Sequence, residues 1–356
     1  MSRPAVRVER HTRASRTALP AAAVVVAIAA SVPLWGSSNL MKTAVSFLTL
    51  LALAQMWNLL AGYGGLLSVG QQAYVGLGAY ALWALSERAG INPFLAVPLA
   101  GLIAAIIAVP TAALAFRLRG GYFAVGTWVI AEVYRLLVIN ISWLGGGSGV
   151  SITSVGRVDR GTREVVVYLL ALAVATGAIA FAYVLLRSRR GLALTAIRDD
   201  ETGAESLGVN VFRSKLWVYI ISAFGCGVAG AVIYLNLLRI QPDAAFGLQW
   251  SALMIFTVVI GGIGTLEGPI IGTVIFFTLQ QVLSDYGTWY LILFGAVAAL
   301  IAVWAKRGIW GLLVRRWPVD LFPVRRRLCL ETACFPEDDS APSPAGDAEA
   351  GTIRQT

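Results

Sequence analysis

Charged residues are scarce in this chain of 356 residues: they make up 13% of it, whereas hydrophobic residues make up 58%. Soluble domains carry about twice that share of charge. The composition therefore excludes an ordinary soluble domain and predicts a protein that lies in a lipid bilayer. The 37 glycines fit that solvent, because small residues let membrane helices approach one another closely.

Residues that most enzyme sites need are also missing. The single histidine, His11, lies in the N-terminal arm, which excludes a histidine-based triad or metal site in the membrane. The three cysteines show no CxxC spacing and predict neither disulfides nor a metal site. No Gly-Lys dipeptide is present, so a P-loop is excluded. We expect no enzymatic activity, no catalytic residue and no cofactor, with any ATP bound by a partner subunit.

Ten apolar stretches approach the length of about 20 residues that a membrane-spanning helix needs. They predict an all-α, polytopic transmembrane helical bundle with about ten spans, some short or broken, over residues 18–305. Residues 1–17 are predicted as a cytoplasmic arm, and its basic residues suggest an uncleaved signal anchor. Residues 306–356 are predicted as a cytoplasmic tail that is basic and then disordered. The expected spans are 18–36, 41–61, 68–86, 94–116, 121–139, 164–186, 215–238, 249–261, 269–284 and 288–305.

The positive charge follows the membrane topology. With both termini in the cytoplasm, the arm, the turn 117–119, the segment from Arg187 to Lys215 and the tail hold 21 of the 28 Lys and Arg residues. This bias fits the positive-inside rule better than a nucleic-acid partner, although the net charge is +9. We expect a multi-pass protein of a bacterial cytoplasmic membrane, surrounded by lipid.

Two glycine-rich stretches interrupt the spans, one in each half of the chain. The first, Asn58–Tyr80, also supplies neutral polar groups at membrane depth, and the second is Gly261–Gly272. Irregular backbone survives at that depth only where protein or a watery cavity satisfies it, and transporters use such broken helices to line substrate paths. A tight turn with glycine packing is the alternative. The path residues that we predict are Asn58, Ser68, Gln71 and Gln72.

The cytoplasmic loop 187–214 contains the signals of a short capped helix. Asp199 or Asp200 can cap its start, Glu201 places negative charge in its first turn, and Gly208 suits the left-handed position after its end. Such a helix of about two turns could dock against another protein, or it could simply orient the two spans that flank it.

Four motifs occur in the order found in the permeases of branched-chain amino-acid ABC transporters: Asn58–Tyr80, Arg119–Thr127, Arg198–Asn210 and Gly261–Gly272. The chain resembles the LivM-type subunit of that family over residues 42 to 308. A departure stands at Gln71 and Gln72, where a histidine is common in the family.

The resemblance implies an import permease for branched-chain or other hydrophobic amino acids. It also implies three kinds of partner: a second, LivH-like permease, LivG-like and LivF-like ATPase subunits, and an extracytoplasmic substrate-binding protein. The helix in the loop 187–214 then corresponds to the coupling helix that fits a groove in the ATPase. Its matching residues are Ala204, Glu205, Leu207 and Gly208.

Other functions stay open on the residues alone. A urea or amide permease of the same family would use similar neutral polar groups. An ion-coupled secondary transporter would need an ion site, for which Glu132 is the candidate carboxylate. Glu132 and Arg135 lie at i and i+3 in one span, where they could form a static charge pair or a functional one. The Gly-x-Gly-x-x-Gly spelling at Gly225–Gly230 lies inside an apolar span without a preceding strand, which indicates helix packing.

Overall fold

The structure is a computed structural model that describes residues 6–9, 13–282, 289–304, 308–316 and 327–330. The tail segment predicted to be disordered lies outside these residues. Two π-helical turns, Leu59–Tyr63 and Ala84–Arg88, extend the helices Ser38–Asn58 and Gln72–Trp83. The short strands pair antiparallel, Val6–Glu9 with Arg327–Leu330 and Val150–Ser151 with Arg239–Ile240. The helices are α1 Arg13–Trp35, α2 Ser38–Asn58, α3 Gln72–Trp83, α4 Pro93–Ala115, α5 Gly121–Asn140, α6 Arg160–Arg187, α7 Arg189–Asp199, α8 Glu201–Ser206, α9 Val211–Leu237, α10 Pro242–Ala245, α11 Leu248–Gly261, α12 Glu267–Val282, α13 Trp289–Trp304 and α14 Gly308–Arg316, and the strands are β1 Val6–Glu9, β2 Val150–Ser151, β3 Arg239–Ile240 and β4 Arg327–Leu330.

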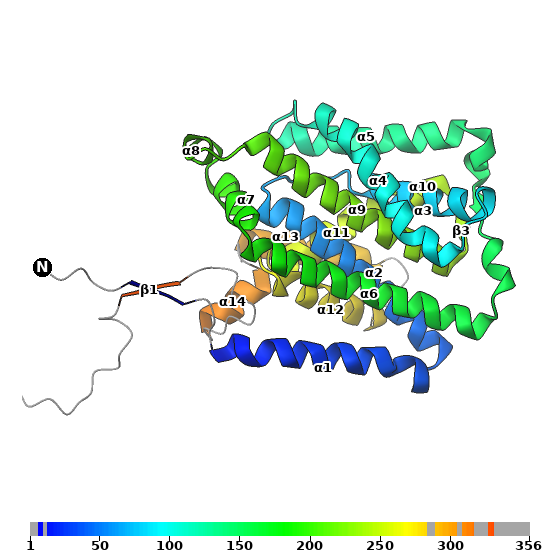
Figure 1. The fold of residues 1–356 in the computed structure, drawn as a ribbon, viewed down its shortest axis with the longest axis horizontal. Coiled ribbons are helices and arrows are strands. Elements are labelled where there is room, and N and C mark those ends of the chain that lie inside the picture. Colours follow the sequence, from blue (N-terminus) through cyan, green and yellow to red (C-terminus); the bar gives the residue numbers. More distant parts are fainter. Residues whose placement is uncertain (1–5, 10–12, 283–288, 305–307, 317–326, 331–356) are drawn as a thin grey trace, which may run out of the picture.

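The long helices lie side by side along one axis of the molecule (Figure 1). Six described segments are long and apolar enough to cross a membrane: Ser38–Tyr63, Pro93–Ala115, Gly121–Asn140, Arg160–Arg187, Val211–Leu237 and Pro242–Gly261. The other four predicted spans coincide with α1, α3, α12 and α13. The predicted all-α, polytopic bundle is confirmed.

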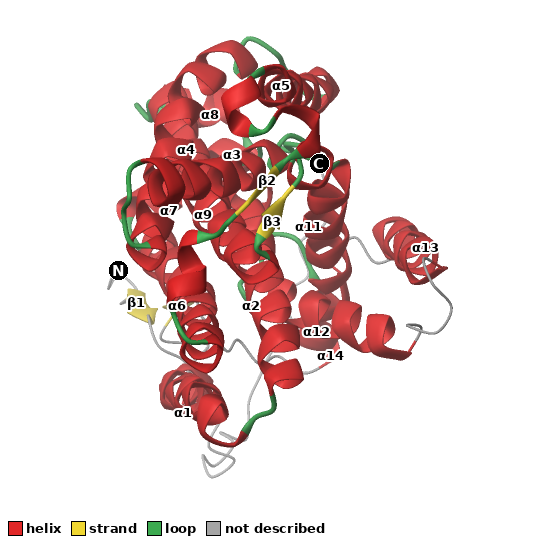
Figure 2. Cartoon of the chain, turned by 90° about the vertical axis from the view of Figure 1, so that its right-hand side faces the viewer, coloured by secondary structure: helices red, strands yellow, loops and turns green. Residues whose placement is uncertain are grey.

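Helix α9 lies at the centre of the bundle, where it contacts α2, α3, α4 and α6 (Figure 2). Small residues bring these helices together. A methyl group on Gly78 of α3 would lie 2.0 Å from the carbonyl oxygen of Gly227, which leaves room for glycine only. Gly230 faces the backbone of Val75 in the same way. The glycines of the Gly-x-Gly-x-x-Gly motif at Gly225–Gly230 thus serve helix packing, as predicted.

Buried and half-buried hydroxyl groups join helices inside the bundle. The Tyr74 hydroxyl of α3 donates to the Tyr219 hydroxyl of α9 at 2.9 Å. The Thr111 and Tyr134 hydroxyls join α4 to α5 at 2.6 Å. In an apolar medium an unpaired hydroxyl is costly, so these pairs favour one arrangement of the four helices.

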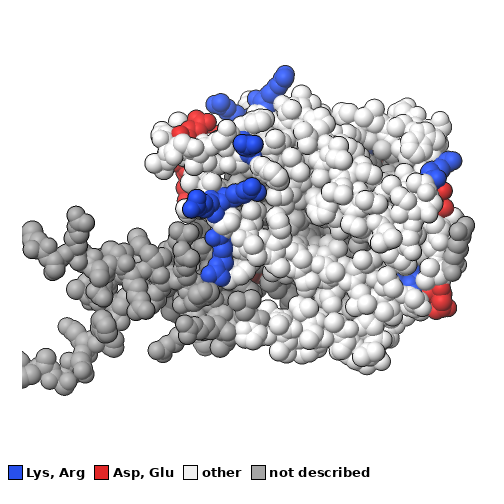
Figure 3. All heavy atoms as spheres, viewed as in Figure 1, with Lys and Arg blue, Asp and Glu red and all other residues white. Residues whose placement is uncertain are grey.

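The connections between helices gather at two ends of the bundle. At one, which we call the α7 end, the Phe116 ring lies 5.9 Å from that of Phe212. At the other, the β2 end, Glu87 accepts hydrogen bonds from Thr153 and Ser154. Strand β1 and helices α7, α8 and α14 share the α7 end, where most of the Lys and Arg side chains visible in Figure 3 also gather. The grouping of the loops agrees with the predicted topology.

Candidate functional site

The two glycine-rich stretches meet at the α7 end. Asn58, at the end of α2, is fully buried. Its side-chain amide donates one hydrogen bond to the turn that precedes α12 and accepts another from it. Its Nδ2 donates to the Thr265 carbonyl oxygen at 2.7 Å, and its Oδ1 accepts from the Gly264 N–H at 2.8 Å. A methyl group on Gly62 would lie 2.6 Å from the Gly264 nitrogen, so the two backbones are in contact. We call the contact between residues 58–65 and 261–268 the glycine junction.

Arg198, near the end of α7, reaches the glycine junction from the predicted cytoplasmic loop. Its Nη1 donates to the Gly62 carbonyl oxygen at 3.0 Å, and its Nη2 lies 2.8 Å from the Asp199 carboxylate. Hydrogen bonds from a charged donor are among the stronger ones in proteins. One side chain therefore connects the loop helices to the junction of the two halves.

Residues 64–71 form a non-helical segment where we predicted the start of a span. The expected span 68–86 begins at Gln72 instead. Before Gln72, side chains from other helices pair with the backbone groups of the non-helical segment. The Trp57 indole donates to the Ser68 carbonyl oxygen at 2.8 Å, and the Thr127 hydroxyl accepts from the Val69 N–H at 3.2 Å. The glycines of this segment and its partners on α2 and α5 override the apolar pattern.

Gln71 and Gln72 are both buried, but among the described residues only the Gln72 side chain has a hydrogen-bond partner. The Ser251 hydroxyl of α11 accepts from the Gln72 N–H at 3.2 Å and donates to its side-chain oxygen. Neither amide atom of Gln71 finds a hydrogen-bond partner among the described residues. Ser68 is buried as well, and its hydroxyl accepts from the Gly70 N–H. The structure thus places Ser68, Gln71 and Gln72 together at the broken start of α3, and Asn58 at the glycine junction.

The loop 187–214 contains two helices, α7 and α8, rather than the single helix that we predicted. Asp200 caps α8 by accepting from the Thr202 N–H at 3.1 Å, and Gly208 has a φ of +83°. Hydrogen bonds from the Gly203 N–H and from Thr202 lower the pKa of the Asp200 carboxyl. The capping and glycine signals were correct, but the eleven residues of α7 were missed, although Ser188 caps its start by accepting a hydrogen bond from the Gly191 N–H.

The residues matched to the coupling helix differ in exposure. Ala204 is buried against Ile197 and Val211, so it fixes α8 on the bundle. Glu205 and Gly208 are exposed, and Leu207 is 83% exposed. A large apolar side chain on a charged end of the molecule suits contact with another protein.

Arg135 pairs with Glu132 and also with a residue that we did not predict. Its Nε lies 2.9 Å from the Glu132 carboxylate, and its Nη1 bonds the Asp243 carboxylate of α10. Glu132 is the twelfth of the 20 residues of α5 and its side chain is 44% exposed. A charge at the bilayer centre costs about 2.5 to 3.5 kcal/mol on insertion scales. An exposed carboxylate on this face of α5 would be costly if lipid chains surrounded it, even with Arg135 as a partner.

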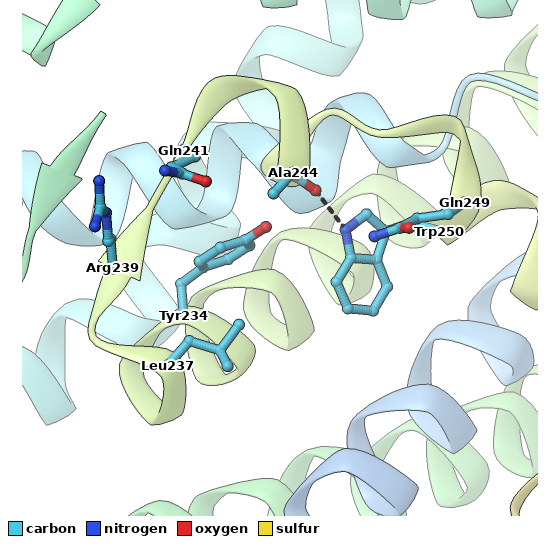
Figure 4. Close-up of a pocket in the computed structure, with 7 residues that line it drawn as sticks. All are labelled: Tyr234, Leu237, Arg239, Gln241, Ala244, Gln249 and Trp250. Atoms are coloured by element: carbon cyan, nitrogen blue, oxygen red, sulfur yellow. Dashed lines mark hydrogen bonds between the residues drawn. The ribbon is translucent and has the colours of Figure 1, made fainter. Parts of the chain in front are cut away.

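A pocket of about 300 Å³ opens beside α10 at the β2 end (Figure 4). The Trp250 indole closes one side by donating to the Ala244 carbonyl oxygen at 2.9 Å. Figure 4 shows Arg239 at the opposite side, with the Tyr234 ring between them. Aromatic rings, an aliphatic side chain and amides share the lining: Tyr234, Leu237, Arg239, Gln241, Ala244, Gln249 and Trp250.

The model of one protein family, described as the branched-chain amino acid transport system permease component, matches residues 39–304. The chain belongs to this family of transport permeases, and the resemblance seen in the motifs is confirmed.

Three named relatives are similar to parts of this chain. The high-affinity branched-chain amino acid transport system permease protein LivM of Salmonella typhimurium is 28% identical over 278 residues, which cover 71% of this chain and 65% of that protein. LivM of Escherichia coli is 27% identical over the same shares. The chain thus spans 65% of the length of these relatives. The ribose import permease protein RbsC of Haemophilus influenzae is 28% identical over 35% of this chain and 40% of its own length. No solved structure matches.

Proposed function

We propose that this chain is the membrane-spanning subunit of an ATP-driven importer for branched-chain or other hydrophobic amino acids. A partner subunit binds and hydrolyses the ATP, since the chain has no P-loop. The LivM relatives, named as permeases for branched-chain amino acids, support the substrate class.

The contact between Arg198 and Gly62 is the observation that carries this proposal. Helix α8 exposes Leu207 and Glu205 at one end of the molecule, and α7 links α8 to the glycine junction through Arg198. Helix α8 is also tied to α9, because Lys215 lies 2.7 Å from Glu201. A movement imposed on α8 by an ATPase would therefore reach both halves of the bundle. A transporter that draws its energy from an ion gradient has no need of such a docking element.

The partners follow from the same proposal. Two ABC ATPase subunits, LivG-like and LivF-like, would bind at the α7 end, and a second, LivH-like permease would complete the pathway. An extracytoplasmic binding protein would deliver substrate at the β2 end. The excess of Lys and Arg supports a cytoplasmic location, in a bacterium, for the α7 end and both termini.

The segment that begins α3 would line the substrate path, with Ser68, Gln71 and Gln72 as its polar groups and Asn58 at its cytoplasmic end. A buried amide without a partner is costly in an apolar medium. Gln71 is therefore the member of this set best suited to hydrogen-bond a passing substrate.

Gln71→Cys is expected to react with a water-soluble thiol reagent in the assembled transporter, and substrate should slow the reaction. Both positions are buried in this chain, but Cys226 packs in the apolar core on α9, away from the proposed path, so it provides an internal control and should stay unmodified. Mass spectrometry of the two peptides measures both thiols in one sample. An inert Cys at position 71, both at rest and with ATP bound, would assign Gln71 to packing.

Gly208→Val is expected to weaken capture of the ATPase while the bundle still folds. A φ of +83° is strained for a β-branched residue by about 1 to 2 kcal/mol, so the end of α8 should reorient. Glu205→Ala should act in the same direction more mildly. Co-purification with a tagged ATPase measures the effect.

Gly90→Val is the matched control for Gly208→Val. Gly90 has a φ of +67°, and an added methyl group would meet nothing within 4 Å at either glycine, but Gly90 lies in the turn before α4 at the β2 end. Capture of the ATPase should be normal in this variant. Equal capture by Gly208→Val would mean that α8 does not dock the ATPase.

A further inference from the structure

Helix α5 exposes one carboxylate within an otherwise apolar face. Val129 and Val133 are 53% and 48% exposed, and Glu132 lies between them. The exposed side of α4 is different: its large exposed side chains, such as Ile106 at 69%, are all apolar. Lipid chains fit α4, whereas the Glu132 carboxylate on α5 pairs with Arg135 and still leaves 44% of its side chain exposed, which lipid chains cannot solvate. The face of α5 around Glu132 therefore borders an aqueous or polar space.

Helix α10 supplies the opposite side of this charged face. Asp243 is 77% exposed and bonds Arg135, which also holds Glu132. The three side chains carry two negative charges and one positive charge. Beneath them, Tyr80 stacks on Phe246 with ring centroids 6.1 Å apart, and its buried hydroxyl has no hydrogen-bond partner among the described residues. The cluster thus keeps both acceptors and donors for a further polar group.

The pocket of Figure 4 also borders α10. Ala244, which follows Asp243 in α10, lines it together with Tyr234, Leu237 and Trp250. A cavity with aromatic and aliphatic side chains among its lining, next to a helix that carries part of a group of opposite charges, has the chemistry needed to hold a small zwitterion with an apolar side chain. Urea has neither a charge for the ionic group nor a side chain for the cavity.

We propose that Glu132, Arg135 and Asp243, together with the pocket beside α10, form a substrate site for a hydrophobic amino acid on its way into the path. Arg135 would bind the substrate carboxylate through the one hydrogen on each of Nη1 and Nη2 that its ion pairs leave free, and Glu132 and Asp243 would hold the ammonium group. The pocket would enclose the side chain. This inference rests on the proposed function and names three residues that select its substrate class.

The test measures the site without relying on transport. In the assembled complex, with the three native cysteines replaced by serine, Val129→Cys and Ile106→Cys are treated with a charged methanethiosulfonate. The thiol on α5 should react and the one on α4 should not, although Ile106 is the more exposed in this chain. L-leucine should slow the reaction at position 129, and urea should not.

The concentration of L-leucine that halves the reaction rate at position 129 then tests whether the two carboxylates bind the substrate. Glu132→Gln or Asp243→Asn should raise it by about tenfold or more, because hydrogen bonds to charged groups are lost. Asp159→Asn is the matched control: it removes a carboxylate from the cap of α6, where asparagine caps equally well, and should leave protection unchanged.

Three results would overturn the site: no reaction at position 129, no protection by L-leucine, or protection unaffected by Glu132→Gln and Asp243→Asn. ATP-dependent leucine uptake by the complex with native side chains would stand in each case. Loss of uptake itself would instead count against the proposed function.

Discussion

Replacing Gly62 by alanine is expected to disrupt the glycine junction and to inactivate the permease. The added methyl group would lie 2.4 Å from Asn58 Oδ1 and 2.6 Å from the Gly264 nitrogen. Neither atom can move away without breaking the two hydrogen bonds that Asn58 makes. Overpacking together with buried polar groups left unpaired should cost about 2 to 5 kcal/mol of stability. The thermal unfolding midpoint in detergent and the yield of assembled complex measure this loss.

Gly177→Ala is the matched control for that change. Gly177 lies within α6, and a methyl group there would meet nothing within 4 Å. Alanine is the better helix former, so this variant should be as stable as the native chain or more so, by about 0.5 to 1 kcal/mol. Equal stability of the variants at positions 62 and 177 would contradict the close contact at the junction.

Arg198→Ala is expected to separate ATP hydrolysis from transport. The variant loses the hydrogen bond to the Gly62 carbonyl oxygen but keeps Leu207 and Glu205, which would contact the ATPase. Capture of the ATPase should therefore be normal, while substrate uptake per ATP hydrolysed falls by about tenfold or more. Uptake and phosphate release measured in the same proteoliposomes give this ratio.

Two further substitutions make the Arg198 result specific. Arg198→Lys keeps the charge but lacks the planar fork that binds Gly62 and Asp199 together, so it should restore coupling only in part. Arg213→Ala removes an exposed charge at the start of α9 and should leave the ratio unchanged. An unchanged ratio in Arg198→Ala would show that the contact with Gly62 does not transmit movement.

The spans could be predicted from sequence because hydropathy and length are local properties. The broken start of α3 and the cap of α8 carried local signals too, in the glycines of 64–70 and in Asp200 and Gly208. The predicted helix at 68–71 was wrong because its backbone bonds are made with Trp57 and Thr127 instead. The pattern of apolar residues could not show that bonds to these two side chains replace helical hydrogen bonds there.

The contacts between distant segments could not be predicted in this way. Asn58 and Gly264 are 206 residues apart, and Arg198 and Gly62 are 136 residues apart. Both glycine stretches were recognised, but no spacing rule showed that they would touch. Asp243 was missed for a similar reason: it follows a predicted span without any local signal, and only the position of α10 beside α5 brings it to Arg135.

Uptake of labelled L-leucine into proteoliposomes tests the central claim most directly. The chain is reconstituted with the second permease, the ATPase subunits and the binding protein of the same transporter, and each component is omitted in turn. We expect uptake only when all components and ATP are present, and no ATP hydrolysis by the chain alone. Leucine uptake driven by an ion gradient in vesicles that hold only this chain, or ATP hydrolysis by the purified chain, would contradict the account.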